Sequence, residues 1–265
     1  MGLIYEVRNQ IAYFIIDNGK MNVITPQIHK DFYHKLKQFE IEKEARVGIL
    51  TGAGGRSFSA GDDIKNVYRP KRTRQEELDA LLFLHQDEGE TPSRPGWEQD
   101  VYMHRRYKPI IAAVNGYCVG AGMIYLMLHS DIRVAGEGAK FGIPELNFGA
   151  AGVSGTTRLA RHIPYTAAAW LAIAGEFIDA EEARRVDLIN QVVPDANVLA
   201  RAEAIAEKII RHPPSAVRVE MEALQLGMDM DRFDAVHHGQ NLYRLHRLNY
   251  EGYGSAEGFF AGRQR

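Results

Sequence analysis

Residues 115–158 read NGYCVGAGMIYLMLHSDIRVAGEGAKFGIPELNFGAAGVSGTTR, and they follow an apolar run, Ile110–Val114, that is typical of a buried strand. A glycine cluster ending at Gly122 comes next, and the apolar run Met123–Leu128 favours a short buried helix. A strand that passes through glycines into a helix exposes backbone N–H groups, which favour negative charge. If that charge develops only during a reaction, the corner is an oxyanion hole. The alternative is a corner formed for packing alone.

A single glutamate stands out farther along this stretch. Glu145 ends the turn-like segment GIPE, residues 142–145, among apolar neighbours. A carboxylate in such surroundings is a candidate acid/base with a raised pKa. The alternative is an ordinary solvated glutamate on a loop.

The composition is that of a globular protein. The chain has 265 residues, 45% of them hydrophobic and 25% charged, which suits one large domain or one domain with a small appendage. A net charge of −2 disfavours a nucleic-acid binder. The single cysteine, Cys118, excludes an intramolecular disulfide and fits a reducing compartment. With no signal-peptide pattern and no bilayer-length apolar run, we expect a cytoplasmic protein that has no membrane partner.

The first two thirds of the chain predict an α/β core. Ile4–Arg8 and Ile11–Asp17 read as an antiparallel hairpin. Thr25, followed by proline, predicts the N-cap of a helix that runs to about Phe39. Val47–Thr51 is the next predicted strand, and the alternation of strands and helices indicates a mainly parallel sheet. Further strands are expected over residues 132–135, 139–141 and 188–193, and further helices over residues 154–161, 166–174 and 179–184.

Two regions depart from this alternation. Tyr68–Tyr107 is rich in charge and proline, with helices predicted over residues 76–85 and 98–106. It is either a substrate-selecting lid or a surface loop. The last third predicts helices over residues 197–211, 215–226 and 231–248 and a short one over 255–265. Their apolar stripes need the core or a neighbouring subunit to pack against.

Four segments resemble the crotonase superfamily, also called the enoyl-CoA hydratase/isomerase family, in that family's order. They are SFSAGDDI (57–64), KPIIAAVNGYCVGAG (108–122), the stretch from DIRVA to FGIPE (131–145), and the stretch from GTTRL to VDLINQVVP (155–194). The resemblance implies repeated ββα units wound into a spiral. It also implies a C-terminal helical region that forms trimers, which commonly pair into hexamers. On this basis we expect an acyl-CoA-binding core at residues 1–195 and a trimerisation region at residues 196–265.

The resemblance also implies a ligand and a set of site residues. The ligand is an acyl-CoA thioester, so coenzyme A enters with the substrate, and no other cofactor or metal is implied. The backbone N–H groups of Asp62 and Ala121 would stabilise a thioester enolate, with Glu145 as acid/base. The substrate-binding positions by this resemblance are Ala60, Gly61, Ile64, Gly120, Gly122, Ile124 and Tyr125.

The chain departs from the family pattern at three places. Ile124 stands where the family's hydratases carry one of two glutamates. Gly116 to Asp131 is one residue longer than usual, which predicts a π-bulge that turns Tyr125 towards the pocket, or else Tyr125 packs in the core. Asp62 replaces a residue that is often alanine, and its side chain points either to the acyl group or to solvent. Other polar groups that could replace the missing glutamate are His104, His129 and Tyr107.

Glu145 alone is compatible with more than one reaction. The leading hypothesis is an acyl-CoA lyase or isomerase of the hydratase/isomerase type, in which Glu145 exchanges protons with the substrate. A C–C hydrolase or decarboxylase is a second hypothesis, and it requires a cation for a second substrate carboxylate or carbonyl. The candidates for that cation are Arg69, Arg72, Arg105 and Arg106. A third hypothesis is a weakened relative that binds acyl-CoA, RNA or another protein, and the charge balance argues against RNA.

Overall fold

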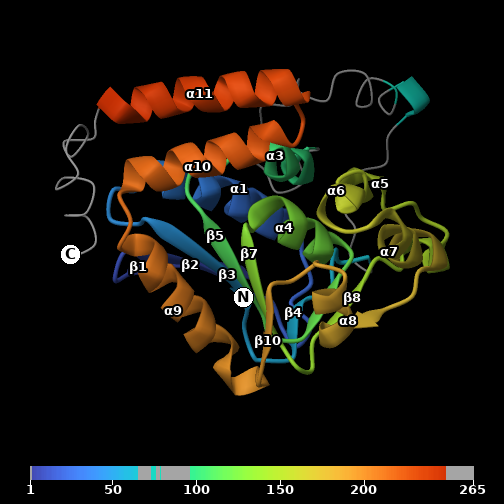
Figure 1. Ribbon diagram of the computed structural model, residues 1–265. Helices are drawn as coiled ribbons and strands as arrows, with labels where there is room; N and C mark the ends of the chain where they lie inside the picture. Colours follow the sequence, from blue (N-terminus) through green and yellow to red (C-terminus); the bar gives the residue numbers. More distant parts are fainter. Residues whose placement is uncertain (1, 65–72, 76–77, 79–95, 249–265) are drawn as a thin grey trace.

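The computed structural model of the protein describes residues 2–64, 73–75, 78 and 96–248 (Figure 1). In this part of the chain the strands form two sheets, with the orders β1-β2-β3-β5-β7-β10 and β4-β6-β8-β9. The larger sheet consists of β1 (Gly2–Arg8), β2 (Ile11–Asp17), β3 (Val47–Gly52), β5 (Ile110–Val114), β7 (Ile132–Gly136) and β10 (Gln191–Val193). The smaller sheet consists of β4 (Ser57–Ser59), β6 (Tyr117–Val119), β8 (Lys140–Gly142) and β9 (Ile178–Asp179).

The helices fill the connections and the C-terminal third. The α-helices are α1 (Pro26–Ile41), α3 (Trp97–Met103), α4 (Ala121–His129), α5 (Val153–Thr156), α6 (Leu159–His162), α7 (Tyr165–Ala169), α8 (Ala180–Arg185), α9 (Val198–Ile210), α10 (Pro214–Gly227) and α11 (Arg232–Leu248). Two 3₁₀ helices, η1 (Glu145–Phe148) and η3 (Asp195–Asn197), and one π-helix, η2 (Trp170–Ala174), complete the helices that lie wholly within the described residues.

The chain passes back and forth between the two sheets. Each of β3, β5 and β7 lies in the larger sheet, and the strand that follows it, β4, β6 or β8, lies in the smaller one. Within the larger sheet β1 and β2 are antiparallel, whereas β2, β3, β5, β7 and β10 run parallel. This repetition confirms the expected α/β class and the ββα spiral.

The central strands β3 and β5 of the larger sheet are buried on both faces, because helices cover the side chains that point to either side. On β3, Ile49 packs with α9, and its neighbour Leu50 packs in the main core with α1 and α4. Helix α9 covers its face with Val198, Ala202 and Ala206. Figure 1 shows α9 on one side of this sheet and α1 and α4 on the other.

Local signals in the sequence explain several boundaries. The Thr25 side chain accepts a hydrogen bond from the N–H of Ile28, so the predicted N-cap of α1 is confirmed. Asp179 caps α8 in the same way, through the N–H of Glu182. The β1–β2 hairpin turns at Asn9 and Gln10, which both have positive φ.

Other predictions need correction. The strand predicted over residues 188–193 is shorter in the structure, where β10 begins at Gln191. Leu188 and Ile189 are apolar because they are buried in the core, but they lie in the segment before the strand. The helix predicted over 154–161 is split into α5 and α6, and the one over 166–174 into α7 and η2. Helix α4 is a regular α-helix with Tyr125 fully buried, so the π-bulge alternative is wrong and the alternative that Tyr125 packs in the core is confirmed. The π-helical turn lies at η2. The predicted helix at 255–265 and nearly all of the one at 76–85 lie outside the described residues.

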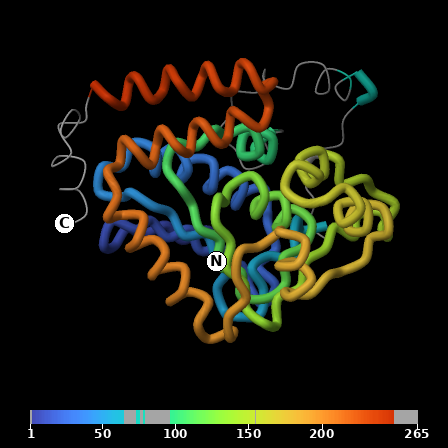
Figure 2. Tube along the Cα trace, in the orientation of Figure 1, coloured from blue at the N-terminus to red at the C-terminus, as the bar shows by residue number. Residues whose placement is uncertain are grey.

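Helices α10 and α11 form a pair along one side of the molecule (Figure 2). Met221 is the buried residue of α10, and Leu242 is the buried residue of α11. Their exposed apolar side chains include Leu224, Phe233, Val236, Leu245 and Leu248. Among the described helices, none combines the length and the apolar composition that crossing a bilayer requires.

Candidate active site

The loop after β4 is fixed by its backbone. Ile24 N–H donates to the carbonyl of Gly61 at 2.8 Å, and Asp63 N–H donates to the carbonyl of Ile24 at 2.9 Å. These two bonds use the carbonyl of Gly61 and the N–H of Asp63, the residues on either side of Asp62. The N–H of Asp62 itself has no acceptor among the described residues. The Ser59 hydroxyl accepts from the N–H of Gly61 at 3.1 Å and donates to the carbonyl of Asn22. The loop therefore presents one free backbone donor in a fixed place.

The start of α4 meets this loop. Gly120 precedes the helix and Ala121 is its first residue, so the Ala121 N–H lies before the first intrahelical bond, from Ile124 N–H to the Gly120 carbonyl. A Cβ on Gly61 would lie 3.1 Å from the nitrogen of Ala121. Gly61 has φ +85° and Gly120 has φ +54°, so both positions favour glycine for conformation as well as space. The two predicted oxyanion donors, Asp62 and Ala121, are therefore brought together.

Glu145 faces this junction from η1. A Cβ placed on Gly120 would lie 3.0 Å from Oε1 of Glu145 and 3.7 Å from the Cα of Gly61. The other carboxylate oxygen, Oε2, is buried and has no hydrogen-bond partner in the described part of the chain. Burial raises the pKa of Glu145 above its ordinary value, and the negative charge of Asp62 raises it further. An unpartnered carboxyl group with a raised pKa is suited to acid/base chemistry.

Ile124 makes one side of the α4 start apolar. Its side chain is buried, and a Cβ on Gly155 would lie only 2.1 Å from its Cγ1. Position 155 therefore cannot carry a side chain without displacing Ile124. Of the predicted substrate-binding residues, Gly61, Gly120, Gly122 and Ile124 lie in the loop after β4 or the start of α4, together with Ala60. Ile64 lies at the end of the described loop and is exposed.

The side chain of Asp62 points to a histidine that the sequence analysis missed. Asp62 Oδ1 lies 3.0 Å from Nε2 of His29, and Nδ1 of His29 lies 2.9 Å from the hydroxyl of Tyr125. Tyr125 is fully buried and stacks on Phe32. Its link to Asp62 is therefore indirect and runs through His29. The signal for His29 was present, since a histidine follows Ile28 on the apolar face of α1. His29, Asp62 and Glu98 also form a group whose donor atoms lie within 4.8 Å of one another and could hold a metal ion.

The other polar candidates lie elsewhere. His129 is fully buried and packs edge-on against Phe32 and Tyr125. His104 packs against Tyr33, and Tyr107 carries the guanidinium groups of two arginines on its ring, those of Arg105 and Arg218. Arg69 and Arg72 lie outside the described residues.

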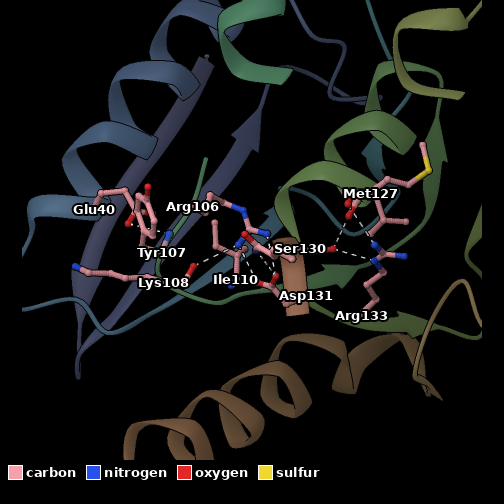
Figure 3. A network of polar contacts seen from close by, with 11 residues as sticks. Glu40, Arg106, Tyr107, Lys108, Ile110, Met127, Ser130, Asp131 and Arg133 are labelled. Carbon is pink, nitrogen blue, oxygen red and sulfur yellow. Dashed lines mark hydrogen bonds and ion pairs between the residues drawn. The ribbon is translucent and has the colours of Figure 1, made fainter. Parts of the chain in front are cut away.

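Figure 3 shows where Arg106 lies, in a polar network at the opposite end of α4. Its guanidinium donates to both carboxylate oxygens of Asp131, at 2.8 and 3.0 Å. Arg133 donates to Ser130, to the carbonyl of Leu188 and to the carbonyl of Met127. Burial lowers the pKa of Arg133 to about 10. Arg106 is thus committed to the fold and is not available for a substrate carboxylate.

Comparisons with known proteins agree with this geometry. The model of a family described as enoyl-CoA hydratase/isomerase matches residues 6–247. The chain is 35% identical to (E)-benzylidenesuccinyl-CoA hydratase of Thauera aromatica, over 87% of this chain and 84% of that protein. It is 32% identical to a short-chain-enoyl-CoA hydratase of Clostridium acetobutylicum, over 86% and 83%.

Solved structures give the same result. The structure superimposes on an enoyl-CoA hydratase from Bacillus anthracis with a TM-score of 0.77 and 28% identity, covering 91% of this chain and 89% of that one. An enoyl-CoA hydratase from Mycobacterium smegmatis has a TM-score of 0.81 at 21% identity, covering 99% and 97%, which bears on the fold alone. By its sequence, its fold and its pair of loops at α4, this chain belongs to the enoyl-CoA hydratase/isomerase family.

Proposed function

We propose that this protein is an acyl-CoA-processing enzyme of the hydratase/isomerase type, with Glu145 exchanging a proton at the α-carbon of the thioester. The observation that carries the proposal is the half-buried Glu145 carboxyl beside the loop after β4 and the start of α4. Within the part of the chain that the structure describes, its Oε2 and the N–H groups of Asp62 and Ala121 have no hydrogen-bond partner. Membership in the family supports the reaction type. Coenzyme A enters as part of the substrate.

The two backbone donors supply the electrostatic part of the reaction. The N–H groups of Asp62 and Ala121 bind the thioester oxygen, which gains negative charge when the substrate becomes an enolate. Because these donors belong to a fixed loop and a helix start, they need no reorientation when the charge appears. The dipole of α4 favours the same charge.

Glu145 supplies the proton transfer. Its carboxylate removes a proton from the α-carbon, and its protonated form returns one to the enolate. The raised pKa of Glu145 allows both forms to be populated closer to neutral pH than an ordinary glutamate would allow. Removal and return of a proton move a double bond, and protonation of the enolate at the α-carbon completes an addition of water to the β-carbon, in both cases without a redox step.

Hydration of crotonyl-CoA, followed by loss of ultraviolet absorbance of the conjugated thioester, tests the proposal. Glu145→Gln removes the proton-transfer group and keeps the shape, so we expect the rate to fall by about 10²–10⁴-fold. Binding of coenzyme A, measured by calorimetry, should persist. Glu137→Gln makes the same change on an exposed glutamate of the turn after β7 and should leave the rate unchanged. Equal rates for Glu145→Gln and wild type would refute the role of Glu145.

The C-terminal helices support a further part of the proposal. We infer that residues 196–265 assemble subunits into a homotrimer or homohexamer, with residues 1–195 forming the acyl-CoA-binding core. The support is the apolar surface of α10 and α11, where Leu224, Phe233 and Leu248 are each more than 70% exposed. A cytoplasmic location, no nucleic-acid partner and no resident cofactor remain predictions of the sequence.

A further inference from the structure

A chain of three side chains leads from the protein interior to the site. Tyr125 of α4 contacts His29 of α1, and His29 contacts Asp62 of the loop after β4. Tyr125 and His29 are buried, whereas the Asp62 side chain is 43% exposed. The chain therefore ends in a carboxylate that solvent can reach, on the residue whose N–H is a proposed oxyanion donor.

The chain of contacts is compatible with one hydrogen-bond direction throughout. Burial keeps the pKa of Tyr125 well above its ordinary value, so the phenol keeps its proton and is able to donate it to Nδ1 of His29. In the tautomer with its hydrogen on Nε2, His29 donates to Oδ1 of Asp62. One oxygen of Asp62 is held, and the other has no hydrogen-bond partner among the described residues. This fixes the orientation of the carboxylate, as a buried partner fixes a catalytic group in other enzymes.

Addition of water needs two proton-transfer events that Glu145 alone must otherwise perform in sequence. One group removes a proton from water, and one delivers a proton to the α-carbon. Ile124 is apolar and supplies neither. The negative charge of Asp62 raises the pKa of Glu145, and both residues lie at the junction of Gly61 and Gly120.

We propose that Asp62 is the second acid/base group of the site, the base for water, and that His29, backed by Tyr125, is its positioning residue. This rests on the proposed hydratase/isomerase function. Asp62 takes a proton from water while the water oxygen bonds to the β-carbon, and the π electrons move into the thioester enolate. Protonated Glu145 then delivers its proton to the α-carbon and the thioester carbonyl re-forms. A proton passes from Asp62 back to Glu145 through solvent, which restores both groups.

Two assays on the same variants separate Asp62 from Glu145. Hydration of crotonyl-CoA requires both groups, whereas exchange of the α-proton of butyryl-CoA with D2O requires Glu145 and the backbone donors. Asp62→Asn keeps the backbone N–H, so we expect hydration kcat to fall by about 10²–10⁴-fold with KM nearly unchanged, while exchange persists. Hydration at the wild-type rate, or equal loss of both reactions, would overturn the proposal.

Variants of the supporting residues test the positioning role. His29→Gln keeps an N–H donor on a flexible side chain and should retain more hydration kcat than His29→Ala, with exchange preserved in both. Tyr125→Phe removes the donor behind His29 and should have a smaller effect than His29→Ala. If His29→Gln and His29→Ala are equally impaired in both assays, or both are unimpaired in hydration, His29 does not position Asp62. Circular dichroism and thermal unfolding identify variants that fail to fold.

Glu137→Gln is the matched control, because Glu137 is an exposed carboxylate in the turn after β7 and belongs to neither group of site residues. Under the acid/base proposal this variant hydrates crotonyl-CoA at the wild-type rate, and neither Zn²⁺ nor a chelator changes the wild-type rate. Loss of hydration in Glu98→Gln, together with dependence on added Zn²⁺, would replace the proposal with a metal site. A wild-type protein that exchanges the α-proton but does not hydrate would overturn the role of Asp62. Absence of both reactions would refute the proposed function itself.

Discussion

The charged groups at the two ends of helix α4 are paired in opposite ways. At its C-terminal end, Arg106 and Asp131 form a two-bond pair, and Arg133 finds oxygen acceptors on neighbouring segments. At its N-terminal end, the carboxyl of Glu145 has an oxygen without a partner among the described residues, and backbone donors face the same junction. Buried polar groups with hydrogen-bond partners stabilise a fold, whereas buried polar groups without partners are typical of sites where a ligand supplies the partner.

The difference has a structural consequence for the site. The network of Figure 3 joins the C-terminal end of α4 to β5 and β7. Lys108 adds three hydrogen bonds, to the carbonyl of Phe39 in the last turn of α1 and to the carbonyls of Glu42 and Ala45 just after that helix. A helix fixed in this way at one end presents its N–H groups at the other end in a constant position. Preorganised donors of this kind are the ones that lower a reaction barrier.

Breaking the satisfied end should give the largest effect, and on stability. Asp131→Ala leaves the buried guanidinium of Arg106 without its carboxylate. The strength of the pair is seen in the pKa of Asp131: burial by itself would raise this pKa, but Arg106 holds it below its ordinary value. We expect a loss of about 3 kcal/mol or more in the free energy of unfolding, measured with urea. Glu145→Gln should lose much less, because Oε2 of that carboxyl has no hydrogen-bond partner among the described residues. Similar losses in the two variants would contradict the contrast between the two ends.

Removing a donor at the unsatisfied end should lower the rate instead. Ala121→Pro deletes one N–H at the first helical position, where proline is tolerated. We expect kcat for crotonyl-CoA hydration to fall by about 10²–10³-fold, the cost of one oxyanion donor. Ala121→Gly keeps the N–H and should lose much less. A wild-type rate in Ala121→Pro, with the helix content retained, would exclude this N–H as a donor.

The smallest expected effect is a shift of a pH profile. Exchange of the α-proton of butyryl-CoA needs the carboxylate form of Glu145, so its rate falls as the pH drops through the pKa of that residue. Since burial and Asp62 raise this pKa, the fall should begin above the range of an ordinary glutamate. Asp62→Asn removes the negative neighbour and should move the fall to lower pH. A profile that does not move, or moves upwards, would mean that the two carboxyl groups do not interact.

Much of the architecture could be predicted from the sequence. The hairpin at Asn9, the capped start of α1 and the glycine corner before α4 are each encoded by neighbouring residues. The candidate roles of Glu145 and of the Asp62 and Ala121 N–H groups rested on family motifs, and the structure brings these residues together. The predicted π-bulge was wrong because one extra residue between Gly116 and Asp131 does not specify where a helix absorbs it. Helix α4 remains regular through His129.

The sequence thus determined the order of the elements and the position of the glycine corner, because these depend on hydrogen bonds and side-chain patterns within a few residues. Only the tertiary structure decided where Asp62, Tyr125 and Arg106 point. Asp62 reaches a histidine 33 residues away, and that histidine reaches a tyrosine 96 residues away. The direction of a buried polar side chain depends on the partner that packing brings to it, so spacing along the chain could not reveal it.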